Sequence, residues 1–148
     1  MSSYRQILYH IVFRTKDSKR TLPLADSDEL YKYIWGITQQ KDCVLYRVNG
    51  MEEHIHIFSD LHPTVALAGF LQKIKTASSL WLKKNSNFPR FCGWAEGYAA
   101  LTYSSRDKEM ITNYIVNQRE HHAKTSFLDE YRAMLEEAGV VIDERYFP

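Results

Sequence analysis

The first forty residues alternate in polarity in a way that predicts a strand, a loop and a helix. Residues 4–14 carry apolar side chains in both alternating sets, which predicts a strand covered on both faces. Residues 15–28 are polar and contain Pro23, so they predict a loop. Residues 29–40 predict the first helix, because apolar residues recur there at helical spacing: Leu30, Tyr33, Ile34 and Ile37.

The middle of the chain predicts a β-hairpin followed by a long helix. Two short apolar runs, 44–48 and 54–58, flank Asn49-Gly50 and predict paired strands. Pro63 suits the start of a helix. The apolar stripe of that helix is formed by Leu67, Phe70, Leu71, Ile74, Ala77, Ser78 and Trp81. Its opposite side carries four lysines, namely Lys73, Lys75, Lys83 and Lys84.

The last third predicts one strand and two helices. Residues 94–103 alternate like a strand, and Gly97 is a candidate bulge. A helix follows from about residue 106, with Ser104 and Asp107 as its capping box. The final helix, 126–138, begins with a Ser126 cap and stops at Gly139, and we expect the tail 140–148 to dock on the core.

This order of elements predicts an α+β fold of the ferredoxin-like, RRM-like type, with helices packed on an antiparallel sheet of four to five strands. We expect a single domain over residues 1–148, with a C-terminal helix and tail from about residue 125. The composition supports this size, since 45% of the 148 residues are hydrophobic, which is ample for one core.

Composition also indicates the cellular compartment and the class of ligand that we expect. The two cysteines, Cys43 and Cys92, lack metal or redox spacing, and we find no signal-peptide pattern, so we expect a cytoplasmic, reduced protein. No apolar run approaches the roughly 20 residues that cross a bilayer, so we expect no membrane role. Residues 1–124 carry 17 Lys and Arg against 12 Asp and Glu, whereas 125–148 carry 2 against 6. A basic body permits a polyanionic ligand but does not demand one.

Two motifs carry candidate chemistry. His54 and His56 share one face of the predicted strand, because residues two apart do so. Tyr114 and Gln118 lie four apart on one stripe of the helix that follows residue 106. The histidine spacing alone fits a half-exposed strand as well as a metal site. A glutamine in the middle of an apolar stripe, however, needs a hydrogen-bond partner or a metal, since an unpaired buried amide costs about 1 to 3 kcal/mol.

The same helix offers rival ligands in His121 and His122, although a solvated histidine pair near a helix C-terminus is the more favourable interpretation. Two imidazoles and an amide oxygen would leave positions open for phosphate oxygens and water, which favours Mg²⁺ or Mn²⁺ over structural Zn²⁺. Such an ion beside a tyrosine is equipment for cutting a phosphodiester bond covalently.

At these residues the chain resembles the small single-tyrosine HUH transposases of bacterial insertion sequences, in which HUH denotes His-hydrophobic-His. The resemblance spans most of the chain and rests on several motifs in the family's order: Tyr9-His10-Ile11-Val12-Phe13-Arg14-Thr15-Lys16, His54-Ile55-His56, Lys75 with Ser78-Ser79, Trp94 with Gly97-Tyr98, and Tyr114-Ile115-x-x-Gln118. One departure is Glu52-Glu53, where relatives often carry Pro-Asp or a similar turn.

The resemblance implies a metal site of His54, His56 and Gln118, with Tyr114 as the nucleophile that forms a 5′-phosphotyrosine with single-stranded DNA. It also implies a homodimer that recognises DNA hairpins near the element's ends, with the tyrosine supplied in cis or by the partner. We expect the four lysines of the middle helix to help bind DNA.

The sequence is also compatible with two other functions. An HUH replication or conjugation initiator would use the same chemistry, although 148 residues leave little room for the further domains of such proteins. A ferredoxin-like module could instead bind nucleic acid without catalysis, through stacking aromatics and lysines.

Overall fold

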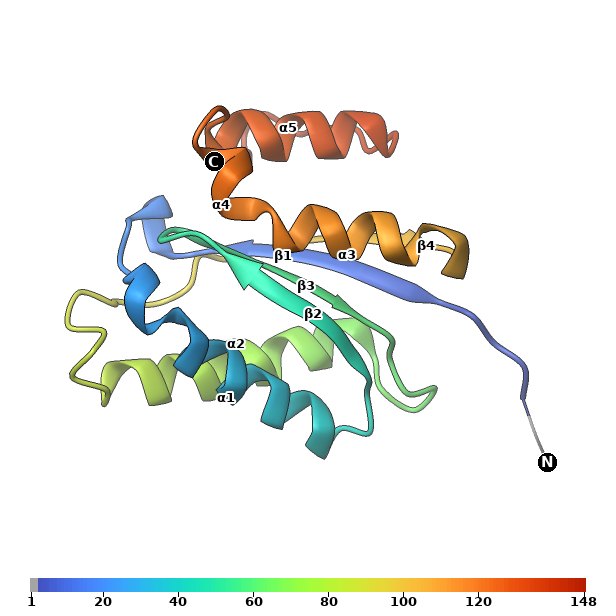
Figure 1. Cartoon of the computed structure of the whole chain (residues 1–148), viewed down its shortest axis with the longest axis horizontal. Coiled ribbons are helices and arrows are strands. Elements are labelled where there is room, and N and C mark those ends of the chain that lie inside the picture. The colour runs from blue at the N-terminus through green and yellow to red at the C-terminus, as the bar shows by residue number, and fades with distance from the viewer. Residues whose placement is uncertain (1–2) are drawn as a thin grey trace.

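A computed structural model describes residues 3–148 and centres on a twisted antiparallel sheet (Figure 1). Within these residues the sheet has four strands in the order β2-β3-β1-β4. Both β3 and β4 pair antiparallel with β1, and β2 pairs with β3. The strands are β1 (Leu8–Arg14), β2 (Leu45–Gly50), β3 (His54–Ser59) and β4 (Ala99–Tyr103).

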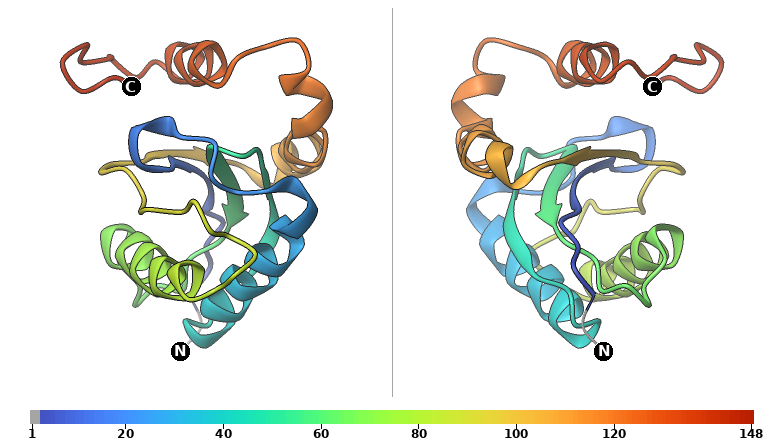
Figure 2. Two further views of the ribbon diagram at one scale, coloured as in Figure 1. Left: turned by 90° about the vertical axis from the view of Figure 1, so that its left-hand side faces the viewer. Right: turned by 90° about the vertical axis from the view of Figure 1, so that its right-hand side faces the viewer.

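Helices cover both faces of the sheet (Figures 1 and 2). One face carries α1 (Ser27–Gln40) and α2 (Leu67–Lys83). The other face carries α3 (Lys108–Val116), the short α4 (Gln118–His122) and α5 (Phe127–Glu137). Short 3₁₀ turns lie at Lys16–Ser18, Leu24–Asp26 and Ser105–Asp107. The predicted ferredoxin-like α+β architecture is confirmed.

The two faces of β3 pack in different layers, as its alternation predicts. Ile55 and Ile57 join the main core with Phe70 and Ile74 of α2. Phe58 instead packs with Ile111 and other residues of α3. His54 and His56 share the parity of Phe58, so they face the layer of α3, α4 and α5.

Two strands are shorter than the sequence predicts. The first begins at Leu8 rather than residue 4, and Tyr4 is 99% exposed. The fourth begins at Ala99 rather than Trp94, which makes only an isolated bridge to Thr15. Gly97 has φ of +82°, so it forms a turn before the strand and is not a bulge within it.

The C-terminal third departs most from the prediction. The single helix expected after residue 106 is broken at Asn117 (ψ 17°), so α4 starts at Gln118 in a new direction. Ser126 caps α5 as predicted, accepting a hydrogen bond from the Asp129 backbone N–H at 3.2 Å. The tail packs along α5, where Phe147 stacks on Tyr131 with ring centroids 5.8 Å apart.

Candidate metal centre and nucleophile

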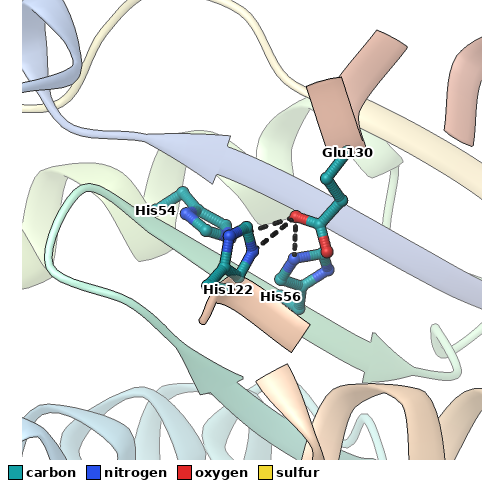
Figure 3. Close-up of side chains that lie close together, drawn as sticks. All are labelled: His54, His56, His122 and Glu130. Carbon is teal, nitrogen blue, oxygen red and sulfur yellow. Dashed lines mark hydrogen bonds and ion pairs between the residues drawn. The ribbon is translucent and has the colours of Figure 1, made fainter. Parts of the chain in front are cut away.

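His54 and His56 are the buried centre of the candidate site (Figure 3). Both side chains are 0% exposed and project from β3 toward α4 and α5. Their rings lie edge to face with centroids 5.0 Å apart. Burying two imidazoles on one strand face is unfavourable unless polar partners meet them.

Gln118 and Tyr114 approach the histidines from the helices above. Gln118 is fully buried, and its Oε1 lies 3.2 Å from His54 Nε2. The Tyr114 ring is half-buried, with its centroid 5.8 Å from that of His56. The chain therefore brings together all four residues that the sequence singled out for metal binding and catalysis, and all four come from the same protomer.

Two further residues enter the site: Glu130, which the sequence interpretation did not place there, and His122, which it named only as a rival ligand. Oε1 of Glu130, on α5, lies 3.3 Å from His54 Nε2, 3.2 Å from His56 Nε2 and 3.0 Å from His122 Nε2. His122 was expected in solvent, yet its side chain is only 5% exposed. His121 lies at the rim, 36% exposed.

The other carboxylate oxygen of Glu130 meets three further groups, one of which is His121 Nε2 at 3.5 Å. The Tyr114 hydroxyl donates a hydrogen bond to Glu130 Oε2, and Gln118 Nε2 donates to the same oxygen at 2.8 Å. Glu130 itself is 4% exposed. A sequence signal existed, because Glu130 falls on the stripe of Phe127 and Met134, but its partners depend on how α5 folds back over the sheet.

The positions of the protons on the imidazole rings show why this cluster needs a cation. His54 Nδ1 lies 2.6 Å from a carboxylate oxygen of Glu53, and His122 Nδ1 lies 2.8 Å from the carbonyl oxygen of Thr125. Both partners only accept, so each neutral ring keeps its proton on Nδ1 and turns the Nε2 lone pair inward. Those lone pairs meet oxygens of Gln118 and Glu130. A metal ion or added protons must separate them.

The pKa values follow from this crowding. Burial lowers the pKa of His56 to about 4 despite its contact with Glu130. Burial also opposes charge on His54, but the carboxylates of Glu130 and Glu53 outweigh it and raise the pKa. Burial raises the pKa of the Glu130 carboxyl, but the neighbouring imidazoles of His122, His54 and His56, when protonated, stabilise the carboxylate and hold that pKa below its usual range. Burial and the Glu130 carboxylate raise the pKa of Tyr114.

His10, on β1, contacts the His56 ring of the candidate site. Its Nε2 lies 2.7 Å from His56 Nδ1, and the two rings are stacked. Burial, followed by the charge of His56, lowers the pKa of His10 to about 3. His10 thus sits in contact with a candidate ligand and is held neutral near pH 7.

We predict that the metal-free chain loses stability as the pH falls from about 6.5 to 4. The unfolded chain protonates His10 and His56 near pH 6.5, whereas the folded chain resists until about 3 and 4. The raised pKa of His54 changes stability only above about pH 6.5, since below that pH both states carry this proton. Each proton bound only by the unfolded chain costs about 1.4 kcal/mol per pH unit.

Urea unfolding in a chelator at several pH values measures this decline. A His10→Gln variant should show a shallower fall, because it lacks one of the groups that the folded chain keeps neutral. A free energy of unfolding that stays level or rises across this range would contradict the prediction.

The four predicted DNA-binding lysines lie on the other side of the sheet from Tyr114. Lys73 and Lys83 are exposed on α2, and Lys84 is exposed as its C-cap. Lys75 differs, because its Nζ donates to the carbonyl oxygens of Ala95 at 3.0 Å and Gly97 at 2.6 Å. Burial lowers the pKa of Lys75. Lys75 therefore stabilises the segment 95–97, which precedes β4, through these two hydrogen bonds.

Comparison with known proteins agrees with this geometry. The family model described as "Transposase IS200 like" matches residues 3–118. A crystal structure of a proposed transposase from Deinococcus radiodurans R1 is 25% identical with a TM-score of 0.57, covering 80% of this chain and 98% of the other. A comparison with curated proteins gives no match.

A second solved structure is the REP-associated tyrosine transposase bound to a REP hairpin. It has a TM-score of 0.60 at 15% identity, covering 84% of this chain and 76% of the other, and so shows a shared fold. Family membership implies a divalent metal ion, and the donors of His54, His56, His122 and Glu130, which lie within 4.8 Å of one another, fit one. Since the family match spans well over half of the 148 residues, the chain belongs to the IS200-like transposase family and is an enzyme that cuts and rejoins DNA.

Proposed function

We propose that the enzyme cleaves and rejoins single-stranded DNA through a covalent 5′-phosphotyrosine on Tyr114. The observation that carries this proposal is the placement of the Tyr114 hydroxyl, which shares the Glu130 carboxylate with His54, His56 and Gln118. A nucleophile and a set of metal donors therefore converge on one point. No ATP is required, because each exchange of phosphate esters conserves the bond energy.

Tyr114 carries its proton until the attack begins. The pKa of the phenol is raised and that of the Glu130 carboxyl is lowered, so the proton stays on Tyr114 in the resting site. We propose that it passes to Glu130 Oε2 as the Tyr114 oxygen bonds to phosphorus. The bond from phosphorus to the 3′-oxygen breaks, and that oxygen takes a proton from water. In rejoining, a 3′-hydroxyl attacks the phosphorus and the Tyr114 oxygen regains its proton.

His54, His56 and Gln118 are the residues that we propose hold the divalent ion, as Mg²⁺ or Mn²⁺. When bound, the ion would polarise the scissile phosphate and offset negative charge in the transition state. Glu53 fixes the ring of His54 through Nδ1 at 2.6 Å, and His10 contacts His56 Nδ1 at 2.7 Å. These outer contacts orient the imidazoles toward the interior of the site.

We propose that the substrate is single-stranded DNA bearing a hairpin, and that the reaction takes place in the cytoplasm. The structural neighbour bound to a REP hairpin supports this choice. The test is incubation of the full chain with hairpin-bearing single-stranded DNA and Mn²⁺ or Mg²⁺, followed by denaturing electrophoresis. A protein–DNA adduct that survives denaturation is expected. Retention of DNA without any adduct would instead indicate a non-catalytic binding module.

We propose that Lys73, Lys83 and Lys84 contact the DNA backbone outside the catalytic face. Replacing all three by alanine should lower the salt slope of DNA binding by about 0.7 for each lost contact, because fewer counterions are released. Lys75 stays intact in this variant, since its ammonium already binds two carbonyl oxygens. A matched variant of exposed Lys32 and Lys41 on the α1 side is the control. An unaltered slope in the triple variant would show that the three lysines only solvate α2.

We also propose a homodimer, because excision of a DNA segment and sealing of its flanks requires two broken ends to be held. β2 and β4 are the edge strands of the sheet, and pairing of two sheets along one of these strands would protect that edge. Sedimentation of the free protein tests this proposal, and a monomer at working concentrations would contradict it.

Tyr114 lies beside the histidines of its own chain, which supports catalysis in cis. We therefore predict that mixing Tyr114→Phe chains with His56→Ala chains restores no cleavage, because every site then lacks one essential group. Adduct formation in the mixture, measured on denaturing gels after exchange of subunits, would show that the tyrosine is supplied by the partner.

A further inference from the structure

Two donors of the candidate site, His122 and Glu130, lie beyond the segment that the family model matches, which ends at residue 118. We propose that these two residues complete the metal centre as ligands, and that the resulting set of three imidazoles and one carboxylate prefers a first-row transition ion such as Mn²⁺ to Mg²⁺. This inference rests on the metal site of the proposed function and deepens it. The C-terminal helices α4 and α5 would then supply two metal ligands that lie outside the segment matched by the family model.

The spacing of the donor atoms suits a shared ion. Glu130 Oε1 lies 3.0 Å from His122 Nε2, 3.2 Å from His56 Nε2 and 3.3 Å from His54 Nε2. Ligands that bind one ion at about 2.1 Å are separated by about 3.0 to 3.4 Å in octahedral or tetrahedral arrangements. The observed distances fall in this range. Gln118 Oε1, 3.1 Å from His122 Nε2, joins the same group.

His122 is oriented as a ligand rather than as a solvated side chain. Its Nδ1 is fixed by the Thr125 carbonyl at 2.8 Å, which leaves Nε2 free of a proton and directed inward. His54 has the same arrangement, with Glu53 in the place of the carbonyl. An outer hydrogen bond that fixes the tautomer is the usual accompaniment of a metal-binding histidine.

Packing places the Glu130 carboxylate before any ion arrives. Phe127, one turn earlier on α5, stacks on the His54 ring with centroids 4.2 Å apart and packs with Val12 and Ala99 of the sheet. This contact fixes α5 over the histidines, so the carboxylate reaches the centre from a rigid element. A buried carboxylate among imidazole lone pairs is costly without a cation.

The donor set decides the choice of ion. Imidazole nitrogen suits transition ions, whereas Mg²⁺ prefers oxygen ligands and keeps several of its waters. Three buried imidazoles therefore favour Mn²⁺ or a later transition ion. Two imidazoles and an amide alone would leave Mg²⁺ a better competitor.

The test measures Mn²⁺ binding to the full chain without DNA, by the loss of the free-ion electron paramagnetic resonance signal. Glu130→Gln and His122→Ala are each expected to weaken Mn²⁺ binding by at least about tenfold. Glu136→Gln, which changes an exposed carboxylate on the same helix, should leave binding unchanged. A hundredfold excess of Mg²⁺ over Mn²⁺ should displace little Mn²⁺ from the unaltered chain.

Anomalous diffraction from Mn²⁺-loaded crystals of the unaltered chain answers the question even if a variant fails to fold. His122 Nε2 and Glu130 Oε1 within bonding distance of the manganese peak are expected. Wild-type affinity in the two folded variants, easy displacement by Mg²⁺, or a peak that either residue does not touch would overturn the inference. The metal-binding test contains no DNA, so its result does not depend on adduct formation. Unchanged Mn²⁺ binding by the variants would contradict the proposed ligands but not the covalent mechanism. Absence of the adduct would contradict the covalent mechanism but not the proposed ligands.

Discussion

The Tyr114→Phe enzyme is expected to form no covalent adduct with hairpin-bearing single-stranded DNA, a loss of at least about a thousandfold. Only the attacking oxygen is removed, and the aromatic ring that packs near His56 and His10 remains. Binding of Mn²⁺ and of the hairpin should therefore persist. Adduct formation is measured on denaturing gels with end-labelled DNA, and binding is measured by gel shift.

A Tyr103→Phe variant is the matched control, because this tyrosine lies close to the centre, with its ring 6.3 Å from that of His10, but its hydroxyl makes no hydrogen bond to Glu130 among the described residues. It should form adduct at close to the wild-type rate. If Tyr114→Phe still formed adduct, the nucleophile would have to be a different side chain.

The second large effect is expected from His56→Ala or His54→Ala. Each substitution removes an imidazole that faces the Glu130 carboxylate, so metal-dependent cleavage should become undetectable. The loss should exceed the roughly 10- to 100-fold that removal of an outer hydrogen-bond partner of a metal ligand costs. Cleavage is measured over a range of Mn²⁺ concentrations, so that weakened metal binding separates from a lost chemical step.

His62→Ala is the control for these variants. His62 lies outside the site, bonded to Thr64 at 2.7 Å, and its removal should not change cleavage. Circular dichroism verifies that the His54 and His56 variants keep their fold, since Ile55 and Ile57 still pack in the main core. Unchanged cleavage by either folded variant would rule out the metal site proposed here.

Local patterns predicted what local geometry controls. The alternation of His54, His56 and Phe58 with Ile55 and Ile57 placed the histidines on the correct face, because strand parity depends only on the strand itself. Gln118 is buried near Tyr114, as predicted, although the two residues lie on separate helices, α3 and α4, rather than on one continuous helix.

The sequence patterns did not predict positions that depend on how the helices and strands pack together. Glu130 reaches the centre because α5 folds back over β1 and β4, which no spacing within the helix encodes. His122, on α4, was named as a rival ligand, but its buried position was not predicted. The late start of β4 has a similar origin. Lys75, on a helix of the opposite layer, binds the carbonyl oxygens of Ala95 and Gly97 in the segment just before β4.

In the proposed reaction, Tyr114 becomes covalently joined to DNA. The most direct measurement is to form the adduct with the unaltered chain, digest the protein and the DNA, and identify the modified peptide by mass spectrometry. We expect a nucleotide attached through a 5′-phosphate to Tyr114, with a free 3′-hydroxyl on the released strand. Attachment at any other residue, or a cleaved strand with no protein attached, would contradict it.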